Sequence, residues 1–501
     1  MFFSRITKLS SLDMVTCAAD FQLAHKARKM TDIINSISGL LWGHILVYLL
    51  IAAGLFFTLR LGFIQFTQFP HMIKVMFQSR QGSGDGISSF QAFCTSLAAR
   101  VGTGNMAGVA VALYLGGAGA IFWMWLIALI GMATSFAEST LAQAYKTVDE
   151  DGNFRGGPAY YMEYGLGKRW MGVIFSLCLI LAFGLVFNAV QSNSIAAAFN
   201  VAFGIPNYVV GIGLVLGSGI IIFGGLKTIS RFAEMVVPFM ALAYLLVALY
   251  VCAINYDLLP NVFMHVINSA FGIEQAGAGA IGYGVMQAMI QGIKRGLFSN
   301  EAGMGSAANA AATATPNPPH PASQGYVQML GVFVDTIIIC TATAALILLS
   351  QQLIPDSGVT GIALTQAALE EHVGSWGATF VAIAILFFAF TSIVANYSYA
   401  ETNLLFLEHN HASGMLIFRL LVLGMVMFGA LGELPLVWTL ADVSMGLMAI
   451  VNVIALFMLS GVVIWLAKDY NAQRKAGKLP TFDPSQNKKL DQTIPKGAWR
   501  K

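Results

Sequence analysis

The sequence predicts an all-α polytopic membrane protein with about eleven transmembrane helices, ordered as two sets of five after one extra helix. Of its 501 residues, 57% are hydrophobic and only 10% are charged, a balance that a soluble globular domain cannot expose to water. Apolar stretches of about 20 residues, long enough to cross a bilayer as helices, fill almost the whole chain. The alternating pattern of a membrane β-barrel is absent. No sizeable soluble catalytic domain remains, so we do not expect an enzyme.

The apolar stretches define the expected spans, which are residues 39–58, 88–114, 118–146, 171–200, 206–225, 232–254, 276–312, 325–350, 375–405, 414–433 and 439–467. Shorter amphipathic stretches suit the membrane interface or a gate, and they are residues 64–78, 157–166, 259–272 and 361–373. The chain then divides into four parts. They are an extra helix with an amphipathic helix (30–87), a first repeat (88–254), a second repeat (255–467) and a tail (468–501).

The distribution of lysine and arginine predicts which side of the membrane the ends face. The segment after Trp465 carries nine basic residues against three acids, and the loop after the first span carries Arg60, Lys74 and Arg80 against Asp85. We expect both segments in the cytoplasm, and the protein in a bacterial inner membrane with a cytoplasmic C-terminus.

Residues 1–29 disagree with this orientation, because they carry five basic residues against two acids and would have to be translocated. The segment has neither a long apolar core nor a small-residue cleavage site, so it is not a signal peptide. We interpret it as an N-terminal extension and expect Met30 to be the true start.

Two spans contain glycines and small polar residues at mid-membrane, around residues 96–108 and 296–306. Unwound backbone is tolerated inside a bilayer only where it lines a cavity. Counted from the second span, the two breaks fall in helices one and six, as an inverted repeat requires. Close helix packing, which also enriches glycine in membrane helices, is the alternative. Free N–H groups at such a break attract a carboxylate, and free carbonyl groups attract an ammonium group or Na⁺.

Three segments resemble motifs of the alanine or glycine:cation symporter family, whose members are similar in fold to the LeuT-type transporters. They are SLAARVGTGN at 96–105, RGGPAYY at 155–161 and FSNEAGMGS at 298–306. The resemblance runs from about residue 31 to residue 470. It implies a symporter that couples import of a neutral amino acid to Na⁺ by alternating access, with no other cofactor. A proton-coupled amino-acid carrier is the alternative, and a channel is less supported because a selectivity filter normally needs rings of groups from several subunits.

The resemblance also implies the site residues. The backbone of the amino acid is expected to contact both breaks and a polar side wall, formed by Thr103, Gly104, Asn105, Phe298, Ser299 and Gln191. The Na⁺ site is expected to use carbonyl and hydroxyl oxygens of Ala98, Val101, Phe388, Thr391 and Ser392. Such hard oxygen ligands suit an alkali cation without a carboxylate.

One departure from the family pattern bears on the substrate. Many alanine and glycine carriers have Gly-Trp where this chain has Ala395-Asn396. Ser392 and Asn396 are four residues apart and share a helix face, so both are expected to line the substrate side-chain pocket. Loss of the indole enlarges that pocket, and the amide favours glutamine beside alanine and glycine. The alternative is an asparagine hydrogen-bonded to a neighbouring helix.

Ionisable residues inside spans are functional candidates, because each costs roughly 2.5–3.5 kcal/mol at the bilayer centre. Lys294 and Arg295 precede the second break and form either an ion-pair gate or a packing contact. Glu301 either holds the unwound backbone, joins a gate, or pairs with Arg100. Other buried acids, which are expected to make interhelical hydrogen bonds or to face a cavity, are Glu138, Asp335 and Glu401. The chain has no Gly-Lys-Ser/Thr phosphate loop, which argues against an ATP-driven pump.

Overall fold

The computed structural model describes residues 32–79, 87–150, 152–273, 278–355, 357–407 and 412–499. Within these ranges the chain is almost entirely helical, so the predicted all-α class is confirmed. The extension 1–29, the expected start at Met30, and Arg80 and Asp85 of the orientation argument lie outside the described residues.

The first part of the chain, up to residue 270, contains the helices α2 (Val47–Arg60), α3 (Ile64–Thr67), α4 (Phe69–Gln78), α5 (Ser89–Arg100), α6 (Val109–Gly116), α7 (Gly119–Ala144), α8 (Pro158–Tyr160), α9 (Arg169–Leu179), α10 (Phe187–Phe203), α11 (Asn207–Ile222), α12 (Gly225–Ile254) and α13 (Leu259–Ala270). Four segments here are π-helical, namely Leu41–Leu46, Gly104–Gly108, Tyr161–Gly165 and Ile180–Val186.

The second part contains α14 (Ala278–Asn300), α15 (Ser306–Thr313), α16 (Pro321–Val332), α17 (Thr341–Leu348), α18 (Ile362–Val373), α19 (Trp376–Leu407), α20 (Ala412–Leu431), α21 (Leu434–Met458), α22 (Ser460–Lys475) and α23 (Lys488–Thr493). Phe333–Cys340 is π-helical and Pro484–Gln486 is a 3₁₀ turn. Four two-residue strands pair as β1 (Ile87–Ser88) with β4 (Ala314–Thr315) and β2 (Thr147–Val148) with β3 (Phe154–Arg155).

Eight helices among the described residues are long and apolar enough to cross a membrane, and they are Asp32–Arg60, Gly119–Ala144, Arg169–Phe203, Gly225–Ile254, Pro321–Leu348, Trp376–Leu407, Ser413–Leu431 and Val437–Met458. Two shorter apolar helices are Gly104–Gly116 and Asn207–Ile222. The count of eleven spans stays a prediction, because interrupted helices do not reach the required length. The predicted amphipathic stretches coincide with α3 and α4, with α8 and its π-helical continuation, and with α13 and α18.

The last predicted span, 439–467, is too long. The helix α21 ends at Met458, and α22 begins at Ser460 after a turn at Leu459. Hydropathy cannot reveal this turn because the sequence stays apolar beyond it: Val462, Val463 and Leu466 are buried inside the protein. The helix α22 packs against α7 and α16, so its apolar face is covered by protein and not by lipid.

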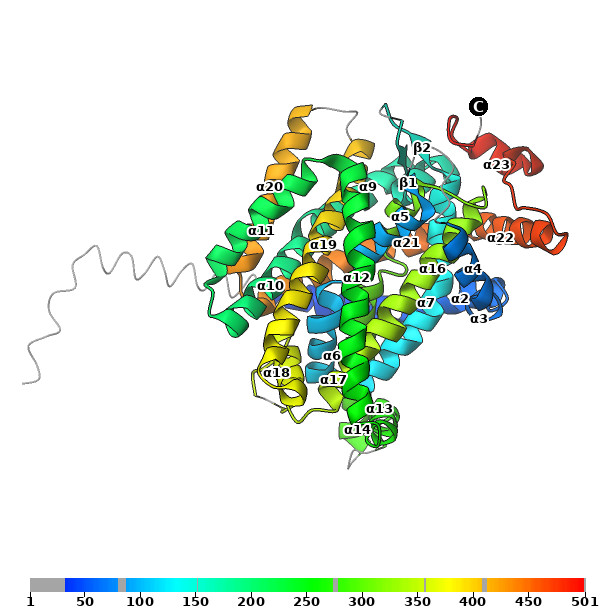
Figure 1. Cartoon of the computed structure of the whole chain (residues 1–501). Coiled ribbons are helices and arrows are strands. Elements are labelled where there is room, and N and C mark those ends of the chain that lie inside the picture. The colour runs from blue at the N-terminus through cyan, green and yellow to red at the C-terminus, as the bar shows by residue number, and fades with distance from the viewer. Residues whose placement is uncertain are drawn as a thin grey trace, which may run out of the picture.

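The helices form two sets of five. The first set consists of the interrupted pair α5–α6, then α7, α9–α10, α11 and α12, and the second set of α14–α15, α16–α17, α19, α20 and α21. Corresponding members pack against each other, since α7 contacts α16 and α10 contacts α19. In Figure 1, α5 starts near the top of the molecule and α14 starts at the bottom. This opposite start is what an odd number of helices per set produces in an inverted repeat.

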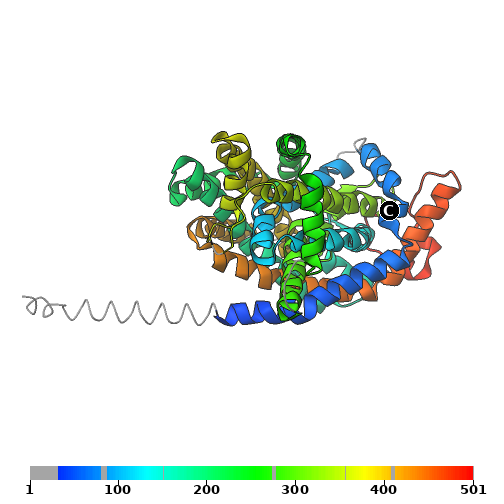
Figure 2. The ribbon, with the colours of Figure 1, turned by 90° about the horizontal axis from the view of Figure 1, so that it is seen from below.

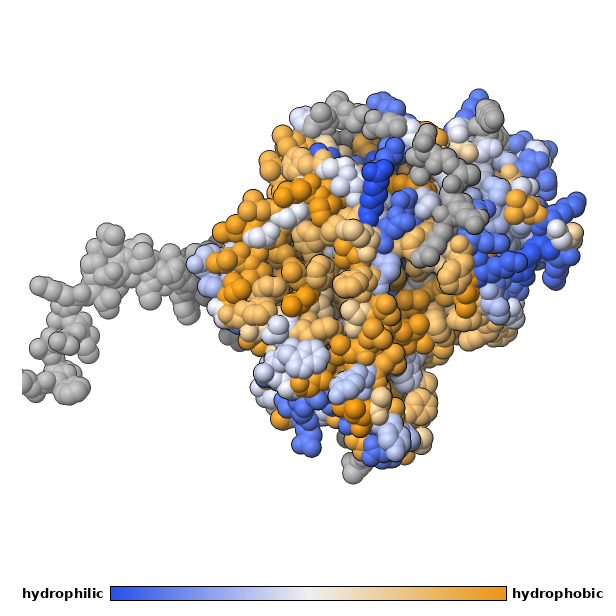
Figure 3. Space-filling model, in the orientation of Figure 1, coloured by the Kyte–Doolittle hydropathy of each residue, from blue (hydrophilic) through white to orange (hydrophobic). Residues whose placement is uncertain are grey.

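The outer surface agrees with a membrane setting. An apolar band crosses the middle of the molecule, and hydrophilic residues gather at the upper right and at the lower end (Figure 3). Ile220, Met235 and Phe239, on α11 and α12, are at least 70% exposed although they are large and apolar. The extra helix Asp32–Arg60 lies along one edge of the bundle (Figure 2), in contact with α7 and α21 through α2.

The bundle has two opposite ends. The C-terminal face carries β1, β4 and the segment after α22, and lies at the top of Figure 1. The opposite face carries α13 and α18, and is called the α13 face.

Candidate functional site

The first break separates α5 from its continuation. A capping box starts α5, because Ser88 Oγ accepts from the Gln91 N–H (3.1 Å) and Gln91 Oε1 accepts from the Ser88 N–H (3.0 Å). The helix ends at Arg100, and the chain resumes helical structure at Thr103. The break is therefore confirmed, but it is confined to Val101 and Gly102 and is shorter than the glycine-rich pattern.

Side chains satisfy the N–H groups freed by this break. Gly102 N–H donates to Asn105 Oδ1 (2.9 Å), and Thr103 donates to Gln191 Oε1 through both its N–H (2.9 Å) and its hydroxyl (2.6 Å). The sequence predicts free N–H groups at this break, but here they are hydrogen-bonded, because buried donors must find partners. A ligand carboxylate would have to replace Gln191 as the acceptor.

The second break lies between α14, which ends at Asn300, and α15, which begins at Ser306. Three residues between them have left-handed backbone angles: Glu301 (φ 60°), Gly303 (φ 92°) and Gly305 (φ 82°). Partners from other helices hold this turn. Glu138 Oε2 on α7 accepts from the Gly305 N–H (3.1 Å), and Asn452 Nδ2 on α21 donates to the Gly303 carbonyl (2.9 Å).

The acids of this region act as hydrogen-bond acceptors. Glu301 Oε2 accepts from the Ser306 hydroxyl (2.6 Å). Arg100 donates to the Gln328 carbonyl (2.9 Å) and to Ser135 Oγ (3.4 Å). Glu301 and Arg100 form no direct ion pair within the described residues, and each hydrogen-bonds to neutral partners instead.

The two breaks touch each other. A Cβ built on Gly104 would lie 3.0 Å from Ser299 Cα and 3.1 Å from the Phe298 ring, so only glycine allows this approach. Asp335, on the π-helical segment between α16 and α17, links them: its Oδ1 accepts from Asn105 Nδ2 (2.6 Å) and its Oδ2 accepts from the Ser299 hydroxyl (2.7 Å). Asp335 thus makes the interhelical hydrogen bonds that the sequence favours for it, and it makes them to both breaks.

Aromatic rings close the region on one side. The ring of Phe298 lies 4.5 Å from that of Phe187 on α10 and 4.7 Å from that of Trp438 on α21, measured between centroids. Phe187 and Trp438 were not predicted, since aromatic residues in apolar helices give no signal that separates packing from a site.

Four of the five residues expected to bind the cation, Ala98, Phe388, Thr391 and Ser392, lie within hydrogen-bond distance of one another. Ser392 Oγ on α19 donates to the Ala98 carbonyl on α5 (2.8 Å) and to the Phe388 carbonyl (3.0 Å), and Thr391 Oγ1 donates to the same Phe388 carbonyl (2.9 Å). Val101 is buried at the end of α5, where helical carbonyls lose their partners. This is a cluster of neutral oxygens between the first break and α19.

Asn396 lies one turn further along α19 and is fully buried. Its Nδ2 donates to Asn188 Oδ1 on α10 (3.1 Å), and its Oδ1 has no hydrogen-bond partner among the described residues. Asn396 therefore makes the hydrogen bond to a neighbouring helix that was the alternative to a role in the substrate pocket. Its amide oxygen is still available to a ligand.

An ion-pair cluster lies on the α13 side of the second break. Lys294 Nζ lies 2.6 Å from Asp442 Oδ2, and Arg295 Nη1 lies 3.0 Å from Asp442 Oδ1. The Arg295 guanidinium lies 4.4 Å from the centroid of the Trp438 ring. Lys294 and Arg295 were predicted as a pair, but their partner was missed, although an acid inside an apolar span was the available signal.

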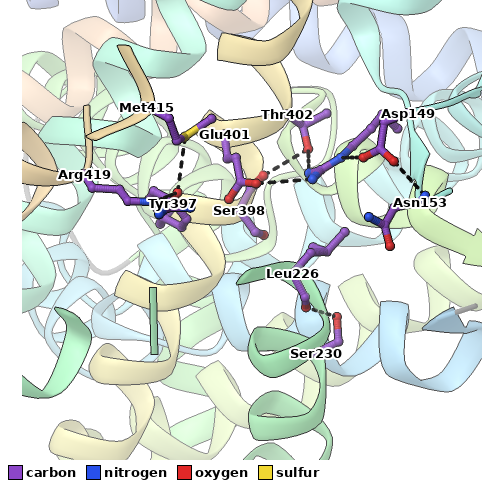
Figure 4. A network of polar contacts seen from close by, with 11 residues as sticks. Asp149, Asn153, Leu226, Ser230, Tyr397, Ser398, Glu401, Thr402, Met415 and Arg419 are labelled. Atoms are coloured by element: carbon purple, nitrogen blue, oxygen red, sulfur yellow. Dashed lines mark hydrogen bonds and ion pairs between the residues drawn. The ribbon is translucent and has the colours of Figure 1, made fainter. Parts of the chain in front are cut away.

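A second ion-pair cluster, drawn in Figure 4, lies beside β2 and β3, which stand at the C-terminal face in Figure 1. Arg155, in the loop after α7, donates to Asp149 (2.9 Å), to Glu401 (3.2 Å) and to Thr402 Oγ1 (3.3 Å). The last two residues belong to α19, so the cluster ties this loop to the helix that carries Ser392. The sequence marks Arg155 only as part of a motif, and the contact gives it a structural role.

Breaks in corresponding helices of two inverted sets, which meet at the centre of a membrane-spanning bundle, define a class of protein: transporters with discontinuous helices. Comparison with known proteins makes this specific. The chain belongs to the sodium:alanine symporter family, whose model matches residues 27–484.

Three curated relatives show how similar the chain is. It is 51% identical over 454 residues to the probable sodium/glutamine symporter GlnT of Bacillus subtilis, covering 90% of this chain and 93% of that one. It is 48% identical over 470 residues to the uncharacterized transporter YaaJ of Escherichia coli, covering 94% and 99%. It is 40% identical over 454 residues to the sodium/alanine symporter AgcS of Methanococcus maripaludis, covering 89% and 98%.

Proposed function

We propose that the protein imports a neutral amino acid together with Na⁺ and works by alternating access. One observation supports this most: two broken helices meet at Gly104 and Ser299, beside a cluster of oxygens from Ala98, Phe388 and Ser392. Backbone exposed at a break can bind a zwitterion, and neutral oxygens from carbonyl and hydroxyl groups can replace the hydration shell of an alkali ion.

In this proposal the amino-acid carboxylate takes the place of Gln191 on the Thr103 N–H, with Gly104 and Asn105 beside it. The ammonium group faces the second break at Phe298 and Ser299. Na⁺ binds the carbonyls of Ala98, Val101 and Phe388 and the hydroxyls of Thr391 and Ser392. Because α5 and α19 both contribute oxygens, the ion holds the first break against α19 and so couples to the amino acid.

Alanine, glycine and glutamine are the proposed substrates. The unpaired Oδ1 of Asn396 is an acceptor for a polar side chain, and its matching donor on a substrate would be the amide of glutamine. The relatives named as sodium/glutamine and sodium/alanine symporters support the same range. Asn396→Trp is expected to narrow uptake toward alanine and glycine, and a variant that keeps full glutamine uptake would contradict the pocket argument.

The two ion-pair clusters are the proposed gates. Asp442 with Lys294 and Arg295 closes the path from the α13 face, and Arg155 with Glu401 closes the path from the C-terminal face. Both ion-pair clusters are formed in this structure and the two breaks are in contact, which supports an occluded conformation. The basic residues after Trp465 support a cytoplasmic C-terminal face, so the Asp442 gate is assigned to the outside.

The test is uptake into proteoliposomes with and without an inward Na⁺ gradient. Labelled alanine, glycine and glutamine are expected to accumulate only with the gradient. Accumulation driven by a pH gradient without Na⁺ would replace Na⁺ by a proton, and uptake indifferent to both gradients would refute coupled symport. Asn105→Ala and Thr391→Ala are each expected to abolish accumulation, because one loses a break contact and the other a cation ligand.

A further inference from the structure

A polar cavity of about 440 Å³ opens near the C-terminal face, apart from the central breaks. Its walls come from the loop after α7, from α8 and α9 and the turn between them, and from the ends of α19 and α20 that lie at this face. Its volume falls in the range of about 300–1,000 Å³ that small-molecule sites occupy. Glu401, on its wall, follows Ser392 by nine residues on α19, which places it about 13 Å along the helix from the cation hydroxyl.

The charges that line this cavity are of both signs. Its lining contains four carboxylates and three guanidinium groups, a balance of −1, and they are Asp149, Glu150, Glu163, Glu401, Arg155, Arg169 and Arg419. The excess of carboxylates disfavours a simple anion. In the part of the chain that the structure describes, no three His, Cys, Asp or Glu residues group as metal ligands. A ligand with one cationic and one anionic group can pair with lining charges of both signs.

Glu401 supplies the position for a cationic group. The residue is 6% exposed, and its Oε1 is the atom paired with Arg155. Its Oε2 is buried and has no hydrogen-bond partner among the described residues. A buried carboxylate oxygen left without a donor is unfavourable, and an ammonium group would supply the missing hydrogen bond.

Arg419 supplies the position for an anionic group. It comes from α20, next to Tyr397 in Figure 4, and its Nε donates to the Tyr397 hydroxyl (2.9 Å). Its guanidinium lies 5.0 Å from the centroid of the Phe223 ring, which holds the planar group in place. Over the described residues the Nη atoms make no hydrogen bond or ion pair, so they are available to a carboxylate.

We propose that this cavity is a second amino-acid site, which binds the transported amino acid from the cytoplasm and slows further import. The ammonium group binds Glu401 Oε2 and the carboxylate binds Arg419. The occupant holds Glu401 in place while Glu401 Oε1 holds Arg155, so α19 and the loop after α7 stay together and the gate on this face opens less often. This proposal rests on the proposed function, because the ligand is the transported substrate.

The experiment measures Na⁺-driven uptake of labelled glutamine and alanine into proteoliposomes loaded with none or with millimolar unlabelled amino acid. In the wild type, internal amino acid is expected to lower the initial rate several-fold. Arg419→Gln is expected to keep its rate in empty vesicles within about twofold and to lose the inhibition. Lys168→Gln is the matched control, because it removes a positive charge beside α9 without lining the cavity, and it should remain inhibited.

Equilibrium binding separates this site from the central one. Purified Asn105→Ala, whose central site is disabled, is expected to retain one weak equivalent of labelled amino acid, and the double variant with Arg419→Gln is expected to retain none at an unchanged melting temperature. Equal inhibition of wild type, Arg419→Gln and Lys168→Gln, or no binding to Asn105→Ala, overturns the second site. Uptake into empty vesicles that needs no cation gradient overturns the proposed function instead.

Discussion

Replacing Gly102 by alanine tests the coupling between the first break and α19. A Cβ at Gly102 would lie 2.3 Å from Ser392 Oγ and 2.8 Å from Gln191 Oε1. Contacts of Cβ are ordinary from 3.4 Å, so Ser392 Oγ would have to retreat by about 1.1 Å, the difference between 3.4 and 2.3 Å. That displacement breaks its 2.8 Å hydrogen bond to the Ala98 carbonyl and spreads the proposed cation ligands apart.

Overpacking of this kind costs about 1–3 kcal/mol. Since about 1.4 kcal/mol corresponds to a factor of ten, the Na⁺ concentration for half-maximal uptake is expected to rise roughly 5- to 150-fold. The assay is Na⁺ titration of initial uptake at a fixed amino-acid concentration. The melting temperature, measured alongside, shows whether the variant still folds.

Gly108→Ala is the matched control, at the end of the π-helical segment that follows the first break. Its Cβ would meet its nearest neighbours at 3.6 and 3.7 Å, and its backbone is helical (φ −64°), so alanine fits there. The control is expected to transport normally. A Gly102→Ala protein with wild-type Na⁺ dependence would refute the assignment of Ser392 to the cation site.

Three further changes test the gate, a support of the second break, and the pH dependence of stability. Asp442→Asn removes the acidic partner of buried Arg295 and half-buried Lys294 and is expected to cost about 3–5 kcal/mol. The expected result is a lower melting temperature that a second substitution, Arg295→Gln, partly restores; an unchanged melting temperature would argue against the ion pairs. Asn452→Ala leaves the Gly303 carbonyl unpaired at the second break and is expected to lower the free energy of unfolding by about 1–3 kcal/mol, with a matching loss of uptake rate. Full uptake would show that the turn does not depend on this hydrogen bond. Burial, together with the nearby charges of Arg474 and Lys74, lowers the pKa of His71 to about 4. Between pH 6.5 and 4 the His71 side chain therefore binds a proton in the unfolded chain but not in the folded protein. Stability is therefore expected to fall as the pH falls through this window, and His71→Gln should flatten the melting profile there; an equally steep profile in the variant would refute this origin.

The sequence by itself determined that the chain lies in a lipid bilayer, that its fold is all-α, and where its helices are interrupted. Hydrophobic runs of the length of a bilayer leave a chain no other environment, and glycines at corresponding places in two sets of five helices mark where the helices are interrupted. It also assigned Ala98 and Ser392 to one site, although this came through a family resemblance and not through spacing.

The tertiary structure decided which polar groups meet. Asp442 pairs with Lys294, and Asp335 joins Asn105 to Ser299, across sequence separations that no local pattern encodes. The structure also decided that the apolar run after Met458 turns back onto α7 and α16 instead of continuing through the membrane. Hydropathy measures only the tendency of a segment to leave water, and lipid and protein interior satisfy that tendency equally. The partner of a buried charge depends on which helices become neighbours, and only packing in three dimensions determines that.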